Sequence, residues 1–548
     1  MPATRTSLRL PPRSCKVMRA LVLAALCAQF AAADSYPRQP GIDAQHYIFR
    51  IELNDRSNEI AGETTAVLKF TQDGITEAWL DLASSAGGKG MTVDAVTGDR
   101  GVRYRHEADR LRLSFPTAQT GEVRRFTVKY HGVPAGGLNS VANKFGERVF
   151  FSENWSDLAH QWLPTIDHPY DKATSEFFVT APVAYEVVAN GAFAGQTDLG
   201  DGRRITHWTE SVPIATWLNN IGVARFTHQT FAQAAGVPLE TWLFEPDRER
   251  GILTFEQPLR LALEFFSARI GPYSYEKLAA VEAAGMDDDG AMEHASEIFF
   301  SQGSVTGRAA FGLVAHETAH QWFGDSVTES DWDDVWLSEG FATYFSVLAI
   351  EHYQGREAFS AALKHSRAAV FDAEDHLPGV AVVQSKPWKG IPNVIVYEKG
   401  SWALHLLRAQ VGTDGFWKGI RAYYRRFRDA NASTADFRQV MEEASGQDLG
   451  WFFRQWLYRA GTPLVQGSWK FNAVRKQVEI DLAQLQGGEP YRLLLEFAIA
   501  NDAGAPEIQT LQMTARRQHF EVPCTREPAS VEIDPNATLL ARVKFRRR

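Results

Sequence analysis

The period of the hydrophobic pattern changes twice along this chain, and these changes constrain its fold more than any other feature. Between Tyr47 and Leu53 apolar residues recur at every second position, which is typical of a half-buried strand. Short apolar runs separated by Gly, Asn, Asp or Pro turns continue to about Phe226. The sequence therefore predicts a β-rich domain over residues 34–229.

After about Pro246 the apolar residues recur at i, i+3, i+4 and i+7, the period of an amphipathic helix. The segments GRAAFGLVAHETAHQWFG and SEGFATYFSVLAIEHYQG are examples, and each ends on a glycine. The helical pattern stops at about Ala460, and strand patterns return. We therefore expect a multidomain α+β protein with a mainly helical domain over residues 230–460 and a C-terminal β-sandwich over residues 461–548.

The first 33 residues differ from the rest of the chain. Basic residues precede the apolar run ALVLAALCA at 20–28, and three alanines at 31–33 precede Asp34. This pattern is typical of a secretory signal, because the run is shorter than the roughly 20 residues that span a bilayer. A buried helix and a membrane anchor are the alternatives. We predict a signal peptide at residues 1–33, export to the periplasm or the medium, and no membrane association after its removal.

Composition and charge limit the partners. The chain has 548 residues, of which 45% are hydrophobic and 22% charged, which are ordinary proportions for a folded protein. Its formal net charge is −9, with the charges spread along the sequence, so we expect no nucleic-acid partner. Cys15 and Cys27 would leave with the signal, and Cys524 alone would remain, so no intramolecular disulfide is expected.

One predicted helix contains the sequence His316-Glu317-Thr318-Ala319-His320. Positions i and i+4 lie on one face of a helix, so both imidazoles can bind one metal ion. Glu317 is offset by about 100°, which lets it reach a water at that ion without being a ligand. Two half-exposed helix histidines are the alternative interpretation.

A third ligand is expected on the next helix, where Glu339 follows a turn-rich connection. Two imidazoles and one carboxylate with an open fourth position are typical of a catalytic zinc site. The longer metalloprotease motif with a third histidine is absent, since Phe323 and Ser326 occupy its glycine and histidine positions. We therefore predict one Zn²⁺ per chain, bound by His316, His320 and Glu339.

Two further motifs accompany this one: Gly290-Ala291-Met292-Glu293-His294 before it and Tyr397-Glu398-Lys399-Gly400 after it. With them the sequence resembles the gluzincin aminopeptidases of the aminopeptidase N and leukotriene hydrolase type, over nearly the whole chain after the signal. The resemblance implies a thermolysin-like catalytic domain at 230–460. It also implies that Glu317 is the general base, that Tyr397 stabilises the transition state, and that Glu293 holds the free amino group of the substrate, with Gly290, Ala291 and Met292 beside it.

The sequence departs from the family pattern at two places. His294 stands where the family usually has Asn, and it can instead hydrogen-bond with the bound peptide or with Glu293. Many relatives have a second anchor for the amine in the N-terminal domain. An ungapped comparison puts Trp155 at that position, and Glu153, two residues away, is the expected substitute. Trp155 can form a wall of the pocket or a cation–π contact with the ammonium group.

The predicted function is an exported, monomeric, zinc-dependent aminopeptidase that acts on peptides with a free N-terminus. An endopeptidase is one alternative, although a carboxylate at Glu293 gains nothing from an internal amide. A lipid-epoxide hydrolase with the same metal site is a second alternative. A peptide-binding protein without catalysis is a third, although such a protein is not expected to keep Glu317 and all three ligands.

Overall fold

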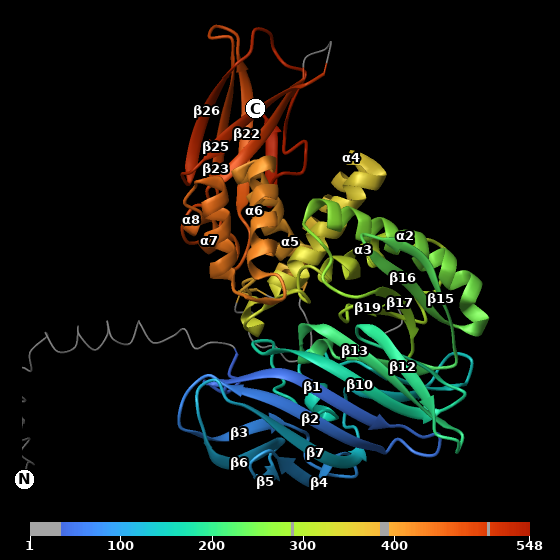
Figure 1. Cartoon of the computed structure of the whole chain (residues 1–548). Helices are drawn as coiled ribbons and strands as arrows, with labels where there is room; N and C mark the ends of the chain where they lie inside the picture. Colours follow the sequence, from blue (N-terminus) through green and yellow to red (C-terminus); the bar gives the residue numbers. More distant parts are fainter. Residues whose placement is uncertain (1–33, 287–289, 377, 384–393, 501–504) are drawn as a thin grey trace, which may run out of the picture.

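Three regions of different architecture follow one another in the computed structural model (Figure 1). A β-rich region at the N-terminus and a smaller β region at the C-terminus lie on either side of a mainly helical middle region. The predicted multidomain fold class is confirmed. The predicted signal segment 1–33 lies outside the described residues, and the structure describes residues 34–286, 290–376, 378–383, 394–500 and 505–548.

The N-terminal region is built on a seven-stranded sheet in the order β12-β13-β10-β1-β2-β7-β4. Alternate residues of β1, such as Tyr47, Phe49 and Ile51, are almost completely buried, as their spacing predicts. The strands of this sheet are β1 (Ile42–Glu52), β2 (Ile60–Phe70), β4 (Gly90–Gly98), β7 (Val123–Val133), β10 (Lys172–Pro182), β12 (Ala192–Asp198) and β13 (Arg203–Ala215).

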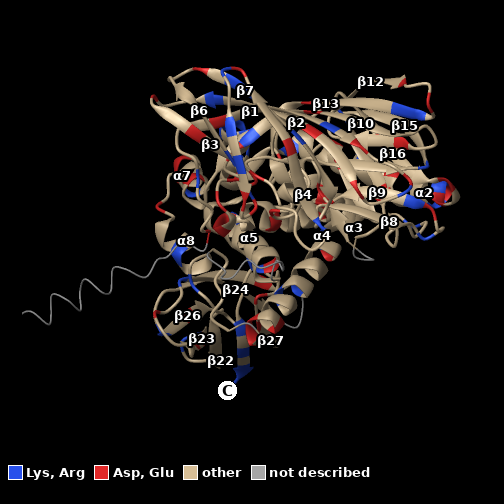
Figure 2. Cartoon of the chain, turned by 90° about the horizontal axis from the view of Figure 1, so that it is seen from below, with Lys and Arg blue, Asp and Glu red and all other residues tan. Residues whose placement is uncertain are grey.

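Two smaller sheets complete this region. One has the order β3-β6-β5 and consists of β3 (Ile75–Asp81), β5 (Arg103–Glu107) and β6 (Arg110–Ala118). The other has the order β11-β14-β9-β8 and consists of β8 (Leu138–Ala142), β9 (Arg148–Ser152), β11 (Glu186–Ala189) and β14 (Ile221–Ala224). Lys, Arg, Asp and Glu are interspersed over the strands of the region, and no strongly basic face is visible in Figure 2.

The middle region contains a five-stranded sheet that the helical pattern of the sequence did not reveal. Its order is β15-β16-β17-β19-β18, and β15 runs through the predicted domain boundary at residue 229. Every residue of β17 and β19 is buried, so these strands lack the polar–apolar alternation by which a strand is recognised. The strands are β15 (Phe226–Ala234), β16 (Val237–Phe244), β17 (Leu278–Ala283), β18 (Ala291–Met292) and β19 (Glu297–Ser301).

The helices α2 and α3 pack beside this sheet, and α5 to α8 lie farther from it, toward the C-terminal region (Figure 1). A break in α4 at Gly355, where φ is 88°, matches the glycine at which the sequence predicted a helix end. The helices are α2 (Arg248–Arg269), α3 (Phe311–His320), α4 (Trp336–His376), α5 (Gly400–Val411), α6 (Thr413–Phe427), α7 (Thr434–Ser445) and α8 (Gly450–Trp456), with a π-helical turn η5 (Ile395–Lys399) before α5. Two short strands, β20 (Val327–Glu329) and β21 (Ala430–Ala432), pair between them.

The C-terminal region consists of two sheets, as the predicted β-sandwich requires. The first has the order β26-β23-β22-β28 and the second β25-β24-β27. Their strands are β22 (Leu464–Asn472), β23 (Gln477–Gln484), β24 (Leu493–Ala500), β25 (Glu507–Met513), β26 (Arg517–Pro523), β27 (Ser530–Ile533) and β28 (Arg542–Arg547). Cys524 is a free thiol. Over the described part of the chain, no helix combines the length and the apolar composition needed to cross a membrane.

Candidate active site

Apart from His294, the residues that the sequence singled out for chemistry line one cavity of about 410 Å³. The helices α3 and α4, the turn η5 and the strand β18 contribute from the middle region, and the segment after β9 contributes from the N-terminal region. The predicted residues in its wall are Glu153, Gly290, Ala291, Met292, Glu293, His316, Glu317, His320, Glu339 and Tyr397.

Two histidines and one glutamate converge in the wall of this cavity. His316 and His320 lie in the last two turns of α3, and Glu339 lies in the first turn of α4. The Nε2 atoms of the two imidazoles are 3.1 Å apart, and Glu339 Oε2 lies 3.5 Å from the first and 3.3 Å from the second. The three side chains therefore offer one donor atom each to a single metal ion.

The hydrogen bonds of His320 decide which of its ring nitrogens can bind a metal. Its Nδ1 lies 3.2 Å from the carbonyl oxygen of Phe323, which can only accept, and 2.9 Å from Ser338 Oγ. Nδ1 therefore carries the proton, and the lone pair is on Nε2. In a second possible ligand group, Glu293, Glu317 and His320, Glu293 Oε1 lies 3.8 Å from Nδ1, the nitrogen that carries the proton. The geometry thus favours His316, His320 and Glu339.

The burial and charge of Glu339 and His316 are also those expected of ligands to a metal cation. Glu339 is 4% exposed, and its buried Oε2 accepts no hydrogen bond from the described residues. An unpaired buried carboxylate oxygen is costly unless a cation or donor compensates it. Burial lowers the pKa of His316, which keeps the imidazole neutral and able to act as a ligand.

Two further groups lie beside this set without belonging to it. Glu317 is 6% exposed, and burial raises the pKa of its carboxyl well above the usual value, a direction that suits a proton acceptor. Tyr397 is placed by the π-helical turn η5, and its hydroxyl donates a 2.8 Å hydrogen bond to Glu339 Oε1. Burial and the negative charge of Glu339 raise the pKa of Tyr397, so this hydroxyl stays protonated.

Glu293 is held in place through its backbone. Gln321, which follows the last residue of α3, donates to the carbonyl oxygen of Glu293 at 3.0 Å and to Asp325 at 2.7 Å. This contact fixes Glu293 relative to the helix that carries the two histidines. Its Oε1 is buried without a hydrogen bond from the described residues, and oxygens of Glu293 and Glu317 lie within 4.8 Å of each other. The carboxylate is thus placed to receive a cationic group of a ligand.

Comparison with known proteins agrees with this geometry. The Peptidase family M1 domain matches residues 258–456, and the Peptidase M1 N-terminal domain matches residues 43–218. The chain belongs to the M1 peptidase family. The M1 domain match contains His316, Glu317, His320 and Glu339, and the predicted resemblance to the gluzincin aminopeptidases is confirmed.

Several M1 relatives are similar over large parts of the chain. Glutamyl aminopeptidase of Rattus norvegicus is 27% identical over 339 residues, which is 59% of this chain and 36% of the relative. Probable aminopeptidase 1 of Sulfurisphaera tokodaii is 24% identical over 521 residues, 91% of this chain and 63% of the relative. This chain therefore spans from about a third to about two thirds of the length of these relatives.

A solved structure shows a similar fold. The crystal structure of an M1 zinc metallopeptidase from Deinococcus radiodurans superposes with a TM-score of 0.66 at 25% sequence identity. The match covers 76% of this chain and 94% of the other chain.

The N-terminal region of this M1 chain contributes Glu153 and Trp155 to the cavity. The backbone N–H of Trp155 donates to Glu153 Oε1 at 3.0 Å, which fixes the carboxylate beside the indole. Gly285 and Met286 also line the cavity and were not predicted from the sequence. They lie just before the Gly290-Ala291-Met292-Glu293-His294 motif, which was the only available signal for them.

His294 differs from the expectation that it contacts the peptide or Glu293. It is completely buried and is not part of the cavity wall. Its ring packs edge-on against Phe299 at 4.8 Å between centroids, and its nitrogens have no hydrogen bond to any described residue. Burial lowers the pKa of His294 to about 3, so the ring is neutral. The expected hydrogen bond with Glu293 is not formed, because the ring is buried against Phe299 of β19.

Proposed function

We propose that this protein is an aminopeptidase that uses one Zn²⁺ to hydrolyse the N-terminal peptide bond of peptides. The observation that supports this function best is that Glu293, a buried carboxylate with an unpaired oxygen, lies beside the His316–His320–Glu339 set. A carboxylate at this place pairs with the ammonium group of a free N-terminus and gains nothing from an internal peptide bond. It therefore favours removal of N-terminal residues over internal cleavage.

His316, His320 and Glu339 would hold the Zn²⁺. Two imidazoles and a carboxylate leave one position open, which is the ligand set of a catalytic rather than a structural site. Zn²⁺ in this position supplies Lewis acidity, which polarises a carbonyl group and makes water more acidic.

Glu317 acts as the general base in this proposal. Its carboxylate takes a proton from the attacking water and returns that proton to the departing amine. Glu293 holds the substrate ammonium group and fixes the distance from the amino group to the scissile bond, as the family resemblance implies. Glu153 is the proposed second anchor of the same ammonium group, since it lines the same cavity.

The Tyr397 hydroxyl donates a hydrogen bond to the oxyanion that develops on the scissile carbonyl oxygen. In the structure this hydroxyl donates to Glu339 Oε1. It must therefore exchange that acceptor for the oxyanion during the reaction. A hydrogen bond that forms mainly in the transition state lowers the barrier without tightening substrate binding.

Export and a monomeric state complete the proposal. The supporting observation for export is the basic and apolar pattern of residues 1–33. Mature protein recovered from outside the cytoplasm should begin at Asp34 by N-terminal sequencing. Recovery only in the cytoplasm, with the first residues intact, would contradict export.

A panel of fluorogenic aminoacyl amides tests the proposed activity. Each amide is compared with its N-acetylated counterpart, with and without a zinc chelator. We expect cleavage of the free-amine substrates only, and loss of cleavage with the chelator. Equal cleavage of acetylated substrates would contradict amine recognition by Glu293 and support the endopeptidase alternative.

A further inference from the structure

The Tyr397-Glu398-Lys399-Gly400 motif contains two buried residues that the proposed chemistry does not use. Lys399 is completely buried, Gly400 is buried beside it, and neither is part of the cavity wall. Both lie within three residues of Tyr397, in or next to the turn η5 that brings the Tyr397 hydroxyl to Glu339. The contacts of Lys399 and Gly400 therefore bear on where this hydroxyl lies.

Gly400 lets the turn lie directly against the helix that carries Glu339. A Cβ atom on Gly400 would lie 3.1 Å from Gly340 Cα, and one on Gly340 would lie 3.0 Å from Gly400 Cα. The two backbones can approach this closely because both residues are glycines. Since Gly340 follows Glu339 in α4, this contact holds the turn beside the carboxylate to which Tyr397 bonds.

Lys399 connects the same turn to a second place in the fold. Its Nζ donates at 2.8 Å to the carbonyl oxygen of Gly461 and lies 3.1 Å from Glu374 Oε1, near the C-terminal end of α4. Glu374 Oε2 in turn accepts the Thr462 hydroxyl at 2.8 Å. A buried ammonium group is costly unless it is paired and hydrogen-bonded, so Lys399 holds these partners together.

The partners of Lys399 lie where the middle region meets the C-terminal region. Gly461 and Thr462 come shortly before β22, the first strand of the C-terminal region. The hydroxyl of Tyr491, a buried residue of that region, donates to the Gly461 carbonyl oxygen at 2.8 Å. One carbonyl group thus accepts both the lysine beside Tyr397 and a tyrosine of the C-terminal region.

On the basis of the proposed function, we propose that Lys399 is a positioning residue for the catalytic step, because it fixes the turn that carries Tyr397 to the junction with the C-terminal region. Among the described residues, its partners are neither proposed metal ligands nor part of the cavity wall. Its effect therefore reaches the reaction through the Tyr397 hydroxyl. A hydroxyl that acts mainly in the transition state affects kcat more than KM.

Lys399→Met tests this role, because methionine keeps an unbranched apolar stem and removes the ammonium group. We expect kcat for the 7-amino-4-methylcoumarin amide of Leu to fall by about 10- to 100-fold, with KM within about threefold of the wild type, as for a catalytic group displaced by about 1 Å. Zinc content should equal that of the wild type, since no proposed ligand is changed. An unchanged kcat would overturn the proposal.

A double-mutant cycle with Tyr397→Phe distinguishes positioning from general damage to the fold. The hydroxyl is already absent in that background, so Lys399→Met should lower kcat by no more than about twofold further. Lys277→Met is the matched control, because Lys277 is also buried at a junction but donates to carbonyl groups of the N-terminal region. Its effect on kcat should be the same in both backgrounds. An equal fold-loss from Lys399→Met in both backgrounds would overturn the proposal.

Thr462→Val replaces Lys399→Met if the latter does not fold. It removes the hydrogen bond to Glu374 Oε2 and leaves no buried charge without its partner. We expect a loss of about threefold in kcat that disappears in the Tyr397→Phe background. A loss that persists there, or no loss in either background, would overturn the proposal.

Hydrogen exchange of residues 395–400, measured by mass spectrometry, tests the position of the turn without turnover. Exchange of this segment should rise in Lys399→Met, or in Thr462→Val if the first variant does not fold, and should not rise in Lys277→Met. Failure of the wild type to cleave any aminoacyl amide would contradict the proposed function. The exchange result then still decides whether Lys399 holds the turn: a rise supports it, and unchanged exchange overturns it.

Discussion

The hydroxyl group of Tyr397 bonds to Glu339 in this structure, so its proposed role depends on a change of partner during the reaction. Tyr397→Phe removes only the oxygen. We expect kcat to fall by about 100- to 1000-fold while KM changes by a few-fold, because the lost contact is strongest in the transition state. The control is Tyr344→Phe, which removes a hydroxyl that hydrogen-bonds with His405, and this variant should retain activity. Equal changes in kcat and KM for Tyr397→Phe would give Tyr397 a role in binding instead.

Ser338 orients a proposed ligand without binding the metal. Its Oγ lies 2.9 Å from His320 Nδ1, whereas the other ring nitrogen, Nε2, faces Glu339 Oε2 at 3.3 Å. Ser338→Ala should weaken zinc binding by about tenfold, as measured by competition with a chelator, since an orienting partner is lost. Ser346→Ala on the same helix, where Oγ bonds to the carbonyl of Thr343, should not change zinc affinity. No change for Ser338→Ala would assign the orientation of His320 to Phe323 alone.

At the scale of elements, periodicity predicted the parts that have one polar face. The helix α2 shows such a pattern of buried and accessible positions, whereas the second half of α3 and the first part of α4 are almost wholly buried. For these two helices the motif spacing from His316 to Glu339 was enough to place both in one site. The sheet that carries the Gly290–His294 motif was not predictable, because β17 and β19 are buried on both faces. The position of His294 was missed for the same reason: it precedes a strand whose neighbours in space cannot be read from a local pattern.

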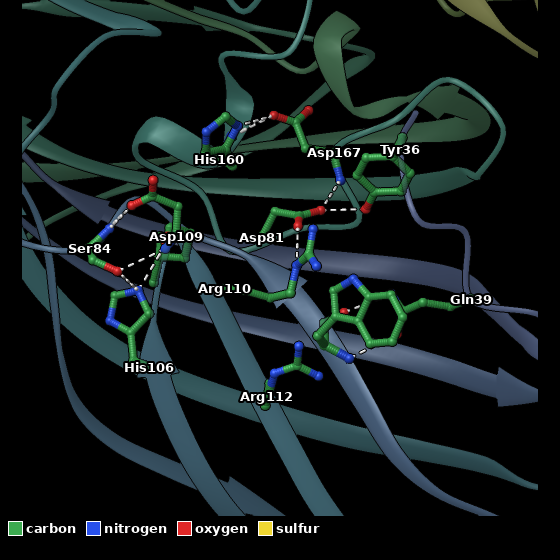
Figure 3. A network of polar contacts seen from close by, with 12 residues as sticks. Tyr36, Gln39, Asp81, Ser84, His106, Asp109, Arg110, Arg112, His160 and Asp167 are labelled. Atoms are coloured by element: carbon green, nitrogen blue, oxygen red, sulfur yellow. Dashed lines mark hydrogen bonds and ion pairs between the residues drawn. The ribbon is translucent and has the colours of Figure 1, made fainter. Parts of the chain in front are cut away.

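A short 3₁₀ turn in the N-terminal region, η1 (Ala159–Gln161), contains a pH-dependent contact. His160 Nδ1 lies 2.7 Å from Asp167 Oδ2 (Figure 3). The backbone N–H of Asp167 donates a hydrogen bond to the carboxylate of Asp81, which also accepts hydrogen bonds from the Tyr36 hydroxyl and the Arg110 guanidinium. Burial opposes the charged form of His160, but its hydrogen bond to Asp167 and the charge of that carboxylate outweigh burial and raise the pKa to about 9.

The sign of the pH effect follows from this raised pKa. The contact contributes its full stability below about pH 6.5 and loses it as the pH rises through about 9. The difference in unfolding free energy between wild type and His160→Gln should therefore shrink by about 3 kcal/mol over this range. Urea denaturation at several pH values measures it, with the exposed His376→Gln as control. A difference that is constant with pH would contradict a charged His160–Asp167 pair.

At the scale of the whole molecule, a buried lysine that is ion-paired within the middle region joins this region to the N-terminal region. Lys277 Nζ donates to the carbonyl oxygens of Ala189 and Gly191 and lies 3.2 Å from Glu297 Oε2. Lys277 is 3% exposed and Glu297 is completely buried. The three-region plan was predictable from the changes of hydrophobic period, but this junction was not, because its partners are far apart in sequence.

Removing one partner of this pair should destabilise the whole fold. Lys277→Met leaves the Glu297 carboxylate buried without a cation, and we expect a loss of about 3–5 kcal/mol in unfolding free energy. Adding Glu297→Gln should recover part of that loss, since no charge then remains unpaired. Lys470→Met, which breaks the more exposed pair with Glu479, is the control and should change the denaturation midpoint little. Failure of the double variant to recover would show that Lys277 acts through the two carbonyls instead.

The central claim is that His316, His320 and Glu339 hold one catalytic Zn²⁺ while Glu317 acts beside it as the base. Metal content and kcat measured side by side for wild type, Glu317→Gln and Glu339→Gln test this division of roles most directly. We predict about one zinc per chain in the wild type, full zinc with nearly complete loss of turnover in Glu317→Gln, and loss of both zinc and turnover in Glu339→Gln. Retained turnover in Glu317→Gln, or full zinc content in Glu339→Gln, would contradict the account.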